Sequence, residues 1–290
     1  MTPINVKYCI LTPTRDEEKF LAATIECVVA QTIQPTEWII INDGSKDRTG
    51  QIIDEYAAKY SWIRALHRPD RGFRTTGGGV EAFLDGLQLL HCKTWDFLVN
   101  LDGDVTFASD YFEACFRRFQ ENSKLGIAGG TIYNKIGGEL KLEKCAAFHV
   151  RGATKIYRRQ CWEQLGGLVR GLGWDTVDEV TANMKGWTTK TFADLHLTHH
   201  RVTGSSWGKW QGLVKDGKAD YLVGYHPLFF VGKCARRIFK RPYGLEALGL
   251  SYGFVRCYVD GTARVVSPQV MQFIRRQQLN RLLGQESIWK

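Results

Sequence analysis

The sequence lacks an apolar run long enough to cross a membrane. Its uncharged stretch Tyr221–Gly232 has 12 residues and includes His226 and Pro227, whereas a transmembrane helix needs about 20 predominantly apolar residues. The first residues also lack a basic segment, an apolar core and a small-residue cleavage site, which together make a secretory signal. We therefore expect a cytosolic protein without a transmembrane helix.

Closely spaced cysteines are also missing. The chain has 8 cysteines, and the two nearest, Cys145 and Cys161, are 16 residues apart. This spacing excludes a Cys-x-x-Cys metal motif and a compact disulfide framework. Because cysteines such as Cys9 and Cys27 stand among apolar residues, we expect free, mostly buried thiols in a reducing compartment.

Acidic residues are scarce in the last third of the chain. Residues 1–200 carry 24 Lys/Arg and 25 Asp/Glu, whereas residues 201–290 carry 15 Lys/Arg and 5 Asp/Glu. The net charge of +9 therefore comes from the C-terminal third. Such a surface suits phosphates in lipid headgroups, nucleic acid or a pyrophosphate ligand, but it is equally compatible with a solvated basic face.

The chain does contain a regular alternation of strand and helix patterns. A composition of 290 residues with 44% hydrophobic and 24% charged side chains excludes disorder, collagen and coiled coil. We expect strands at 8–12, 38–42, 63–66 and 96–101, and helices at 16–29, 49–60 and 80–91. This alternation predicts parallel βαβ units in an α/β fold, with ligands at the carboxyl ends of the strands.

The second half is less regular and predicts a mixed α+β arrangement. Glycine-rich loops surround an expected helix at 174–186, and a basic helical segment is expected at 270–283. Neither an internal repeat nor a clear linker is visible.

Two acids follow the fourth expected strand, in Asp102-Gly103-Asp104. Glycine between them lets the backbone turn so that both carboxylates face one point, and such oxygen ligands suit Mg²⁺ or Mn²⁺. The competing interpretation is an exposed turn. Placement at a strand end favours the metal site.

Asp43 ends the second expected strand, where a carboxylate can accept a hydrogen bond from a ribose or base; alternatively it caps the next helix.

The glycines at 77–79 match a dinucleotide fingerprint, but that motif must follow a strand directly. We instead expect Arg71, Arg74 and the adjoining backbone N–H groups to contact a diphosphate, unless the segment is simply a flexible connection.

Further acids and histidines lie in the second half. Asp175, Asp178 and Glu179 share one face of the expected helix, where they are either solvated or available as a general base or metal ligand. His199 and His200 offer imidazoles that can complete a metal site with the two aspartates, although surface or core histidines are more common.

With these residues assembled, the chain resembles a family 2 glycosyltransferase of the inverting GT-A type. The resemblance is carried by four motifs in order, which span residues 7 to about 203: 12–18 (TPTRDEE), 41–49 (INDGSKDRT), 101–104 (LDGD), and 173–179 (GWDTVDE) followed by His199-His200.

The resemblance implies inverting transfer of a sugar from a nucleotide-diphosphate donor to an acceptor hydroxyl. It assigns the base and ribose site to Thr12, Pro13, Thr14 and Asp43, the diphosphate and its Mn²⁺ or Mg²⁺ ion to Asp102, Gly103 and Asp104, the last metal ligand to His199 or His200, and the catalytic base to an acid among 175–179. The family usually has adjacent Glu-Asp before an Arg-bearing helix. Here the spacing to Gly186 favours Asp175, and adjacency favours Asp178.

The expected organisation is a GT-A catalytic domain at 1–203, with a nucleotide-binding half (1–105) and an acceptor half (106–203), followed by a basic, helical C-terminal extension at 204–290. We expect a UDP-sugar donor and a saccharide or lipid-linked acceptor, in polysaccharide or glycolipid synthesis. The extension is expected to dock on the anionic inner face of the cell membrane, with Phe229, Phe230, Ile238 and Phe239 entering the interface. The alternative is that the aromatic residues pack on the catalytic domain and the basic side chains are only solvated.

Two other functions remain open from the residues. A sugar-phosphate nucleotidyltransferase would also use metal-binding acids, but it normally has a glycine-rich loop after the first strand, which Thr12-Pro-Thr-Arg-Asp16 is not. A non-catalytic protein that binds anionic membranes would leave the acidic residues unexplained. No nucleic-acid partner is expected, because the basic tail lacks the aromatic pattern of an RNA-binding sheet.

Overall fold

The computed structural model describes residues 4–72, 78–201, 208–239 and 243–289. Arg74, one of the expected diphosphate contacts, lies outside these ranges.

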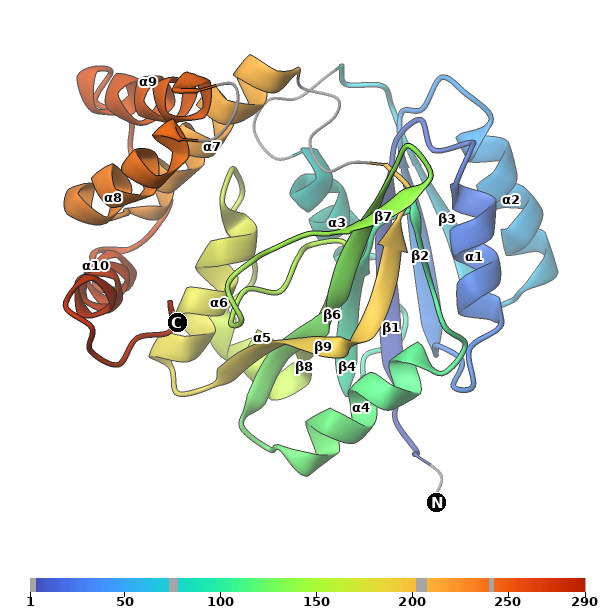
Figure 1. Cartoon of the computed structure of the whole chain (residues 1–290). Coiled ribbons are helices and arrows are strands. Elements are labelled where there is room, and N and C mark those ends of the chain that lie inside the picture. Colours follow the sequence, from blue (N-terminus) through green and yellow to red (C-terminus); the bar gives the residue numbers. More distant parts are fainter. Residues whose placement is uncertain (1–3, 73–77, 202–207, 240–242, 290) are drawn as a thin grey trace.

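The described chain contains a nine-stranded mixed sheet in the order β3-β2-β1-β4-β8-β6-β9-β5, with β7 paired to β6 (Figure 1). Its first four strands are parallel neighbours: β1 (Tyr8–Thr14), β2 (Glu37–Asp43), β3 (Ile63–Arg68) and β4 (Phe97–Leu101). The later strands are β5 (Val105–Phe107), β6 (Leu125–Ile136), β7 (Glu139–Leu142), β8 (Thr154–Arg158) and β9 (Thr188–His199). β8 joins β4 antiparallel, so the direction of the sheet changes there.

Helices cover both faces of the sheet because its central strands are apolar on both sides. Along β1, Tyr8 and Ile10 belong to the core under α1 (Leu21–Val29), α2 (Thr49–Lys59) and α4 (Tyr111–Glu121). Cys9 and Leu11 belong to the opposite core, under α3 (Gly78–Gln88) and α5 (Arg159–Leu165), with α6 (Trp174–Met184) on the same side. This period of two is the pleat of the strand.

The α/β expectation for the first hundred residues is confirmed, with one change at the first helix. That helix begins at Leu21 instead of Asp16. Asp16 has a left-handed backbone with φ of 54°, and it exchanges hydrogen bonds with the next strand-end loop through Ser45 and Lys46. The residues before α1 therefore join the loop after β2 at the carboxyl edge of the parallel strands.

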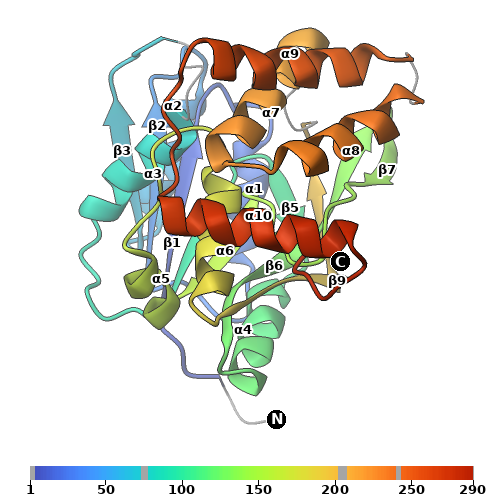
Figure 2. The same cartoon turned by 90° about the vertical axis from the view of Figure 1, so that its left-hand side faces the viewer.

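The C-terminal extension is helical, as expected. It consists of α7 (Lys209–Val223), α8 (Pro227–Ile238), α9 (Leu245–Val259) and α10 (Pro268–Leu282). α10 lies across α6 (Figure 2), and an apolar cluster joins them through Val177, Val180, Val270 and Ile274. The extension is thus packed against the α/β part of the chain. None of the helices in the described ranges has the length and apolarity needed to traverse a bilayer.

The four apolar residues expected to face a membrane divide into two pairs. Phe229 and Phe230 are buried, at 8% and 5% exposure, so the expectation that they enter a membrane is wrong. The Phe230 ring instead stacks on Phe254, with ring centroids 3.9 Å apart. Ile238 and Phe239 remain on the surface.

Candidate active site

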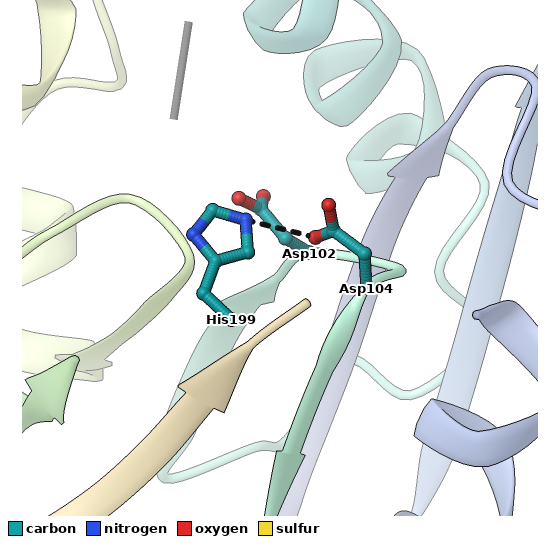
Figure 3. A group of neighbouring side chains, drawn as sticks. All are labelled: Asp102, Asp104 and His199. Atoms are coloured by element: carbon teal, nitrogen blue, oxygen red, sulfur yellow. Dashed lines mark ion pairs between the residues drawn. The ribbon is translucent and has the colours of Figure 1, made fainter. Parts of the chain in front are cut away.

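Asp102, Asp104 and His199 form a compact cluster at the carboxyl edge of the parallel strands. Figure 3 shows their side chains turned toward one another. One ligand atom from each residue lies within 4.8 Å of the others, and His199 Nε2 is 3.1 Å from Asp104 Oδ1. Two carboxylates and one imidazole so placed can hold a divalent cation.

Strand pairing brings the three residues together. Asp102 directly follows β4, and Asp104 directly precedes β5. β5 pairs antiparallel with β9 in a register that sets Val105 opposite His199. The histidine therefore reaches the aspartates although it lies almost a hundred residues later in the sequence. Gly103 is required between the acids, because a Cβ there would lie 2.8 Å from Thr14 Cγ2.

Burial and repulsion between the two carboxylates determine the electrostatics of the cluster, in which His199 and Arg201 both lie against Asp104. Burial, and then the Asp104 carboxylate, raises the pKa of Asp102 to about 6. Burial lowers the pKa of His199, but the hydrogen bond and charge of Asp104 outweigh it and give a net increase. A bound cation would relieve the repulsion between the two carboxylates.

His200 does not join this cluster. Its Nε2 lies 2.8 Å from Thr106 Oγ1, and its ring stacks on Phe20 at a centroid distance of 5.6 Å. Of the two histidines considered as metal ligands, the structure therefore places only His199 beside the aspartates.

Asp43 stands at the tip of β2 among arginines. Its Oδ1 is 3.0 Å from Arg68 Nη1 and 3.3 Å from Arg71 Nη2, while Arg15 Nη1 donates to its backbone carbonyl at 3.0 Å. Burial raises the pKa of Asp43, against the opposing charges of Arg71 and Arg15. The Asp43 carboxylate can accept hydrogen bonds from a polar ligand at this edge. The partly exposed guanidiniums of Arg15 and Arg71 can donate to it.

The β1 residues expected at the nucleotide site differ in what they present. Thr12 is fully buried, and its hydroxyl accepts from the Trp38 indole at 2.9 Å. Its side chain is therefore part of the core, which corrects its assignment to the donor site. Thr14 is buried and donates to the Ile41 carbonyl, whereas Pro13 is half-buried at the strand end.

Two of the three acids on α6, Asp178 and Glu179, form a buried ion cluster with Lys155. Lys155, which is 0% exposed, lies 3.1 Å from both Asp178 carboxylate oxygens and 2.9 Å from Glu179 Oε1. Tyr157 donates to Asp178 at 2.6 Å, and Glu179 accepts from the Val150 N–H and pairs with His149. These contacts hold Asp178 and Glu179 inside the protein, away from any acceptor.

Asp175 is placed differently in the first turn of α6. Lys155 Nζ donates to its backbone carbonyl at 2.7 Å, which leaves its half-buried carboxylate outside the Lys155 contacts. Burial raises the pKa of Asp175, but His149, Lys155 and Arg151 outweigh burial and lower it overall. Arg151 also acts on the Asp102 carboxyl, so one guanidinium is close enough to influence both acids.

Residue patterns did not reveal Lys155, Glu17 or Arg201. Arg201 pairs with the buried Glu17, and its Nε is 3.3 Å from Asp104 Oδ2. A lysine inside the apolar run of β8 was the available signal for Lys155, because a charge in a buried strand requires a partner. The position of Arg201 directly after the two histidines was the signal for that residue.

Comparisons with known proteins give the family and the fold. The family model described as Glycosyl transferase family 2 matches residues 9–169. A curated relative, the uncharacterized glycosyltransferase EpsJ of Bacillus subtilis, is 27% identical over 127 residues, which are 43% of this chain and 34% of the relative. The match therefore spans about a third of that protein's length.

Solved structures of low sequence identity share the fold. The mannosyltransferase PcManGT of Pyrobaculum calidifontis, in complex with GDP-Man and Mn²⁺, superposes with a TM-score of 0.57 at 14% identity, covering 98% of this chain and 77% of that one. TarS 1-349 of S. aureus, in complex with UDP-GlcNAc, gives a TM-score of 0.57 at 13% identity, covering 96% and 92%. Because the family model covers more than half of the sequence, the chain belongs to glycosyl transferase family 2.

Proposed function

We propose that this protein transfers a sugar, with inversion, from a nucleotide-diphosphate donor to an acceptor hydroxyl. The observation that carries the proposal is the Asp102–Asp104–His199 cluster at the carboxyl edge of the parallel strands in a family 2 chain. In α/β sheets, this edge is where ligands bind.

The donor would lie along this edge. Pro13 and Asp43, at the tips of β1 and β2, would contact the base and ribose, and Arg71 would pair with the diphosphate. Asp102, Asp104 and His199 would hold a divalent cation, and the mixture of carboxylates with an imidazole suits Mn²⁺ better than Mg²⁺. When bound, such an ion neutralises charge on the departing diphosphate.

Asp175 is the proposed general base. In a single displacement, the acceptor oxygen forms a bond to the anomeric carbon while the bond from that carbon to the diphosphate oxygen breaks, and Asp175 takes the hydroxyl proton. Attack opposite the leaving group inverts the anomeric centre. Asp175 fits this role because its carboxylate, unlike those of Asp178 and Glu179, is not paired with Lys155, and because it begins a helix that Asp178 and Glu179 anchor.

We favour a UDP-sugar as donor and a saccharide or lipid-linked acceptor, in polysaccharide or glycolipid synthesis at the cytoplasmic face of the cell membrane. The donor preference is supported by the TarS complex with UDP-GlcNAc, and the GDP-Man complex of PcManGT supports the competing choice. The basic extension next to the catalytic part supports an acceptor carried by an anionic membrane.

A panel of nucleotide sugars tests the proposal, with release of the nucleotide measured with and without Mn²⁺. Asp175→Asn should lower kcat by at least about a hundredfold, as expected for loss of a general base, and leave the KM for the donor nearly unchanged. Asp110→Asn, which alters an exposed acid before α4, is the matched control and should behave like the wild type.

Nucleotide release that persists at the wild-type rate in Asp175→Asn would exclude this residue as the base. Absence of release with every nucleotide sugar and acceptor in the panel would contradict the proposed reaction itself.

A further inference from the structure

The extension carries a concentration of exposed apolar side chains. Among the described residues, 17 large hydrophobic side chains are exposed, and 13 of them lie between Trp210 and Leu283. The other four are Leu89, Ile136, Leu140 and Leu142. An apolar patch as large as that of the extension usually marks an interaction site.

Two helical rows form most of this surface, which we call the α8–α9 apolar face. Spacings of three, four and seven residues place most members of each row on one side of its helix. The most exposed members are Phe239 and Val259, both at 80%. The face consists of Leu228, Val231, Ile238 and Phe239 from α8 and its C-cap, and Leu248, Tyr252, Val255 and Val259 from α9.

The two rows share one side of a helical hairpin. α8 and α9 run in opposite directions and lie at the outer edge of the molecule (Figures 1 and 2). Their mutual contact uses other residues, among them Phe230, Cys234 and Phe254. α7 covers another side of α9, where a Cβ at Gly253 would lie 2.0 Å from the Val214 carbonyl oxygen. Helix geometry then leaves most of both rows on the side turned away from α7. Tyr252 lies at the edge of this side, where its ring centroid is 6.2 Å from that of Trp210 on α7.

The chemistry around this face is basic. Residues 221–245 contain five Lys or Arg and no Asp or Glu. Arg236 is exposed on α8. On α9 the 59% exposed Arg256 side chain donates to the Tyr252 hydroxyl at 3.0 Å and pairs with Asp260 at 3.1 Å. Apolar side chains bordered by long cationic ones are the composition of a helix that lies in a membrane interface.

We propose that the α8–α9 apolar face inserts into the headgroup region of an anionic lipid bilayer. This docking would hold the candidate active site beside a lipid-linked acceptor. The choice of acceptor rests on the proposed glycosyl transfer, whereas the docking does not. A symmetric pair of chains is the less favourable occupant, because a two-fold contact through this face would bring the basic borders of both copies together.

Vesicle co-sedimentation of the full chain tests the docking. The wild type should bind vesicles of phosphatidylcholine mixed with phosphatidylglycerol, bind phosphatidylcholine alone weakly, and dissociate as salt increases. Val231→Ser with Val255→Ser should reduce the partition coefficient by at least about tenfold, because both side chains are more than half exposed on the face. Leu140→Ser, at a 57% exposed position on β7, is the matched control.

Three outcomes would overturn the docking proposal: no sedimentation with any vesicle, equal binding by the double variant and the wild type, or a dimer in solution that the double variant dissociates without a change in vesicle binding. Circular dichroism verifies that each variant is folded. Nucleotide release, measured without vesicles on the same samples, separates the two proposals. Loss of docking with retained release contradicts only the docking, and docking without release contradicts only the proposed reaction.

Discussion

Lys155→Met is the sharpest test of how the acidic face of α6 is stabilised. Methionine nearly retains the length and volume of the side chain, so the substitution removes the charge without opening a large cavity. It leaves Asp178 and Glu179, which are 4% and 0% exposed, without their shared cation. The same change releases the Asp175 carbonyl, to which Lys155 Nζ donates.

The expected cost follows from the geometry. At an effective dielectric constant of about 20, each charge pair at a separation of about 3 Å is worth roughly 5 kcal/mol before desolvation. Breaking a buried pair typically costs about 3–5 kcal/mol. Asp178 keeps its bond from Tyr157, and Glu179 keeps His149 and the Val150 N–H. We therefore expect a loss near the lower value, about 3 kcal/mol at neutral pH.

The loss should depend on pH in a definite direction. In the wild type, burial already raises the pKa of Asp178 to about 6, against the charge of Lys155. Without Lys155 the folded pKa of Asp178 rises further above the unfolded value of about 4. The folded state then binds more protons than the unfolded state, so stability increases as pH falls. The difference between variant and wild type should therefore shrink between about pH 8 and about pH 6.

Urea unfolding of both proteins across this pH range measures the effect. Lys190→Met, at an exposed lysine in β9, is the control and should change stability by less than about 0.5 kcal/mol. Adding Asp178→Asn to Lys155→Met should recover part of the loss, since the two residues are directly coupled. A cost below about 1 kcal/mol, or one that does not change with pH, would refute the buried-charge argument.

Two further results are expected. Asp104→Ala should weaken Mn²⁺ binding, measured by electron paramagnetic resonance, by at least about a hundredfold with an unchanged circular dichroism spectrum; undiminished binding would place the ion elsewhere. Gly217→Ala should destabilise the protein by about 1–3 kcal/mol, because the added Cβ would lie 2.0 Å from the Leu250 carbonyl oxygen between α7 and α9. Gly212→Ala in the same helix has nothing within 4 Å and should stabilise it by about 0.5–1 kcal/mol; equal effects of the two substitutions in thermal unfolding would contradict the packing argument.

The sequence by itself determined the scaffold of the first half and the placement of its acids. β1, β2 and β4 were visible as short apolar runs, and α2 and α3 as amphipathic segments, because periodicity of two or 3.6 residues is a local property. Asp43 and Asp102 could be placed at strand ends for the same reason, and parallel strands then require that their carboxyl ends share one edge.

Only the tertiary structure decided which of several equivalent side chains meet. His199 and His200 are neighbours in sequence, yet the register of β5 with β9 directs one to the aspartates and the other to Thr106 and Phe20. Likewise, the three acids of α6 share a helical face, and Lys155 on β8 engages the carboxylates of two of them.

The extension shows the same division. Its helices and positive charge could be recognised from the sequence, but Phe229, Phe230 and Phe239 look alike there. Packing of α8 against α9 and the C-terminal residues buries the first two and leaves the third 80% exposed. The burial and the partners of a side chain depend on contacts between segments far apart in the chain. Such contacts cannot be predicted from the local sequence pattern.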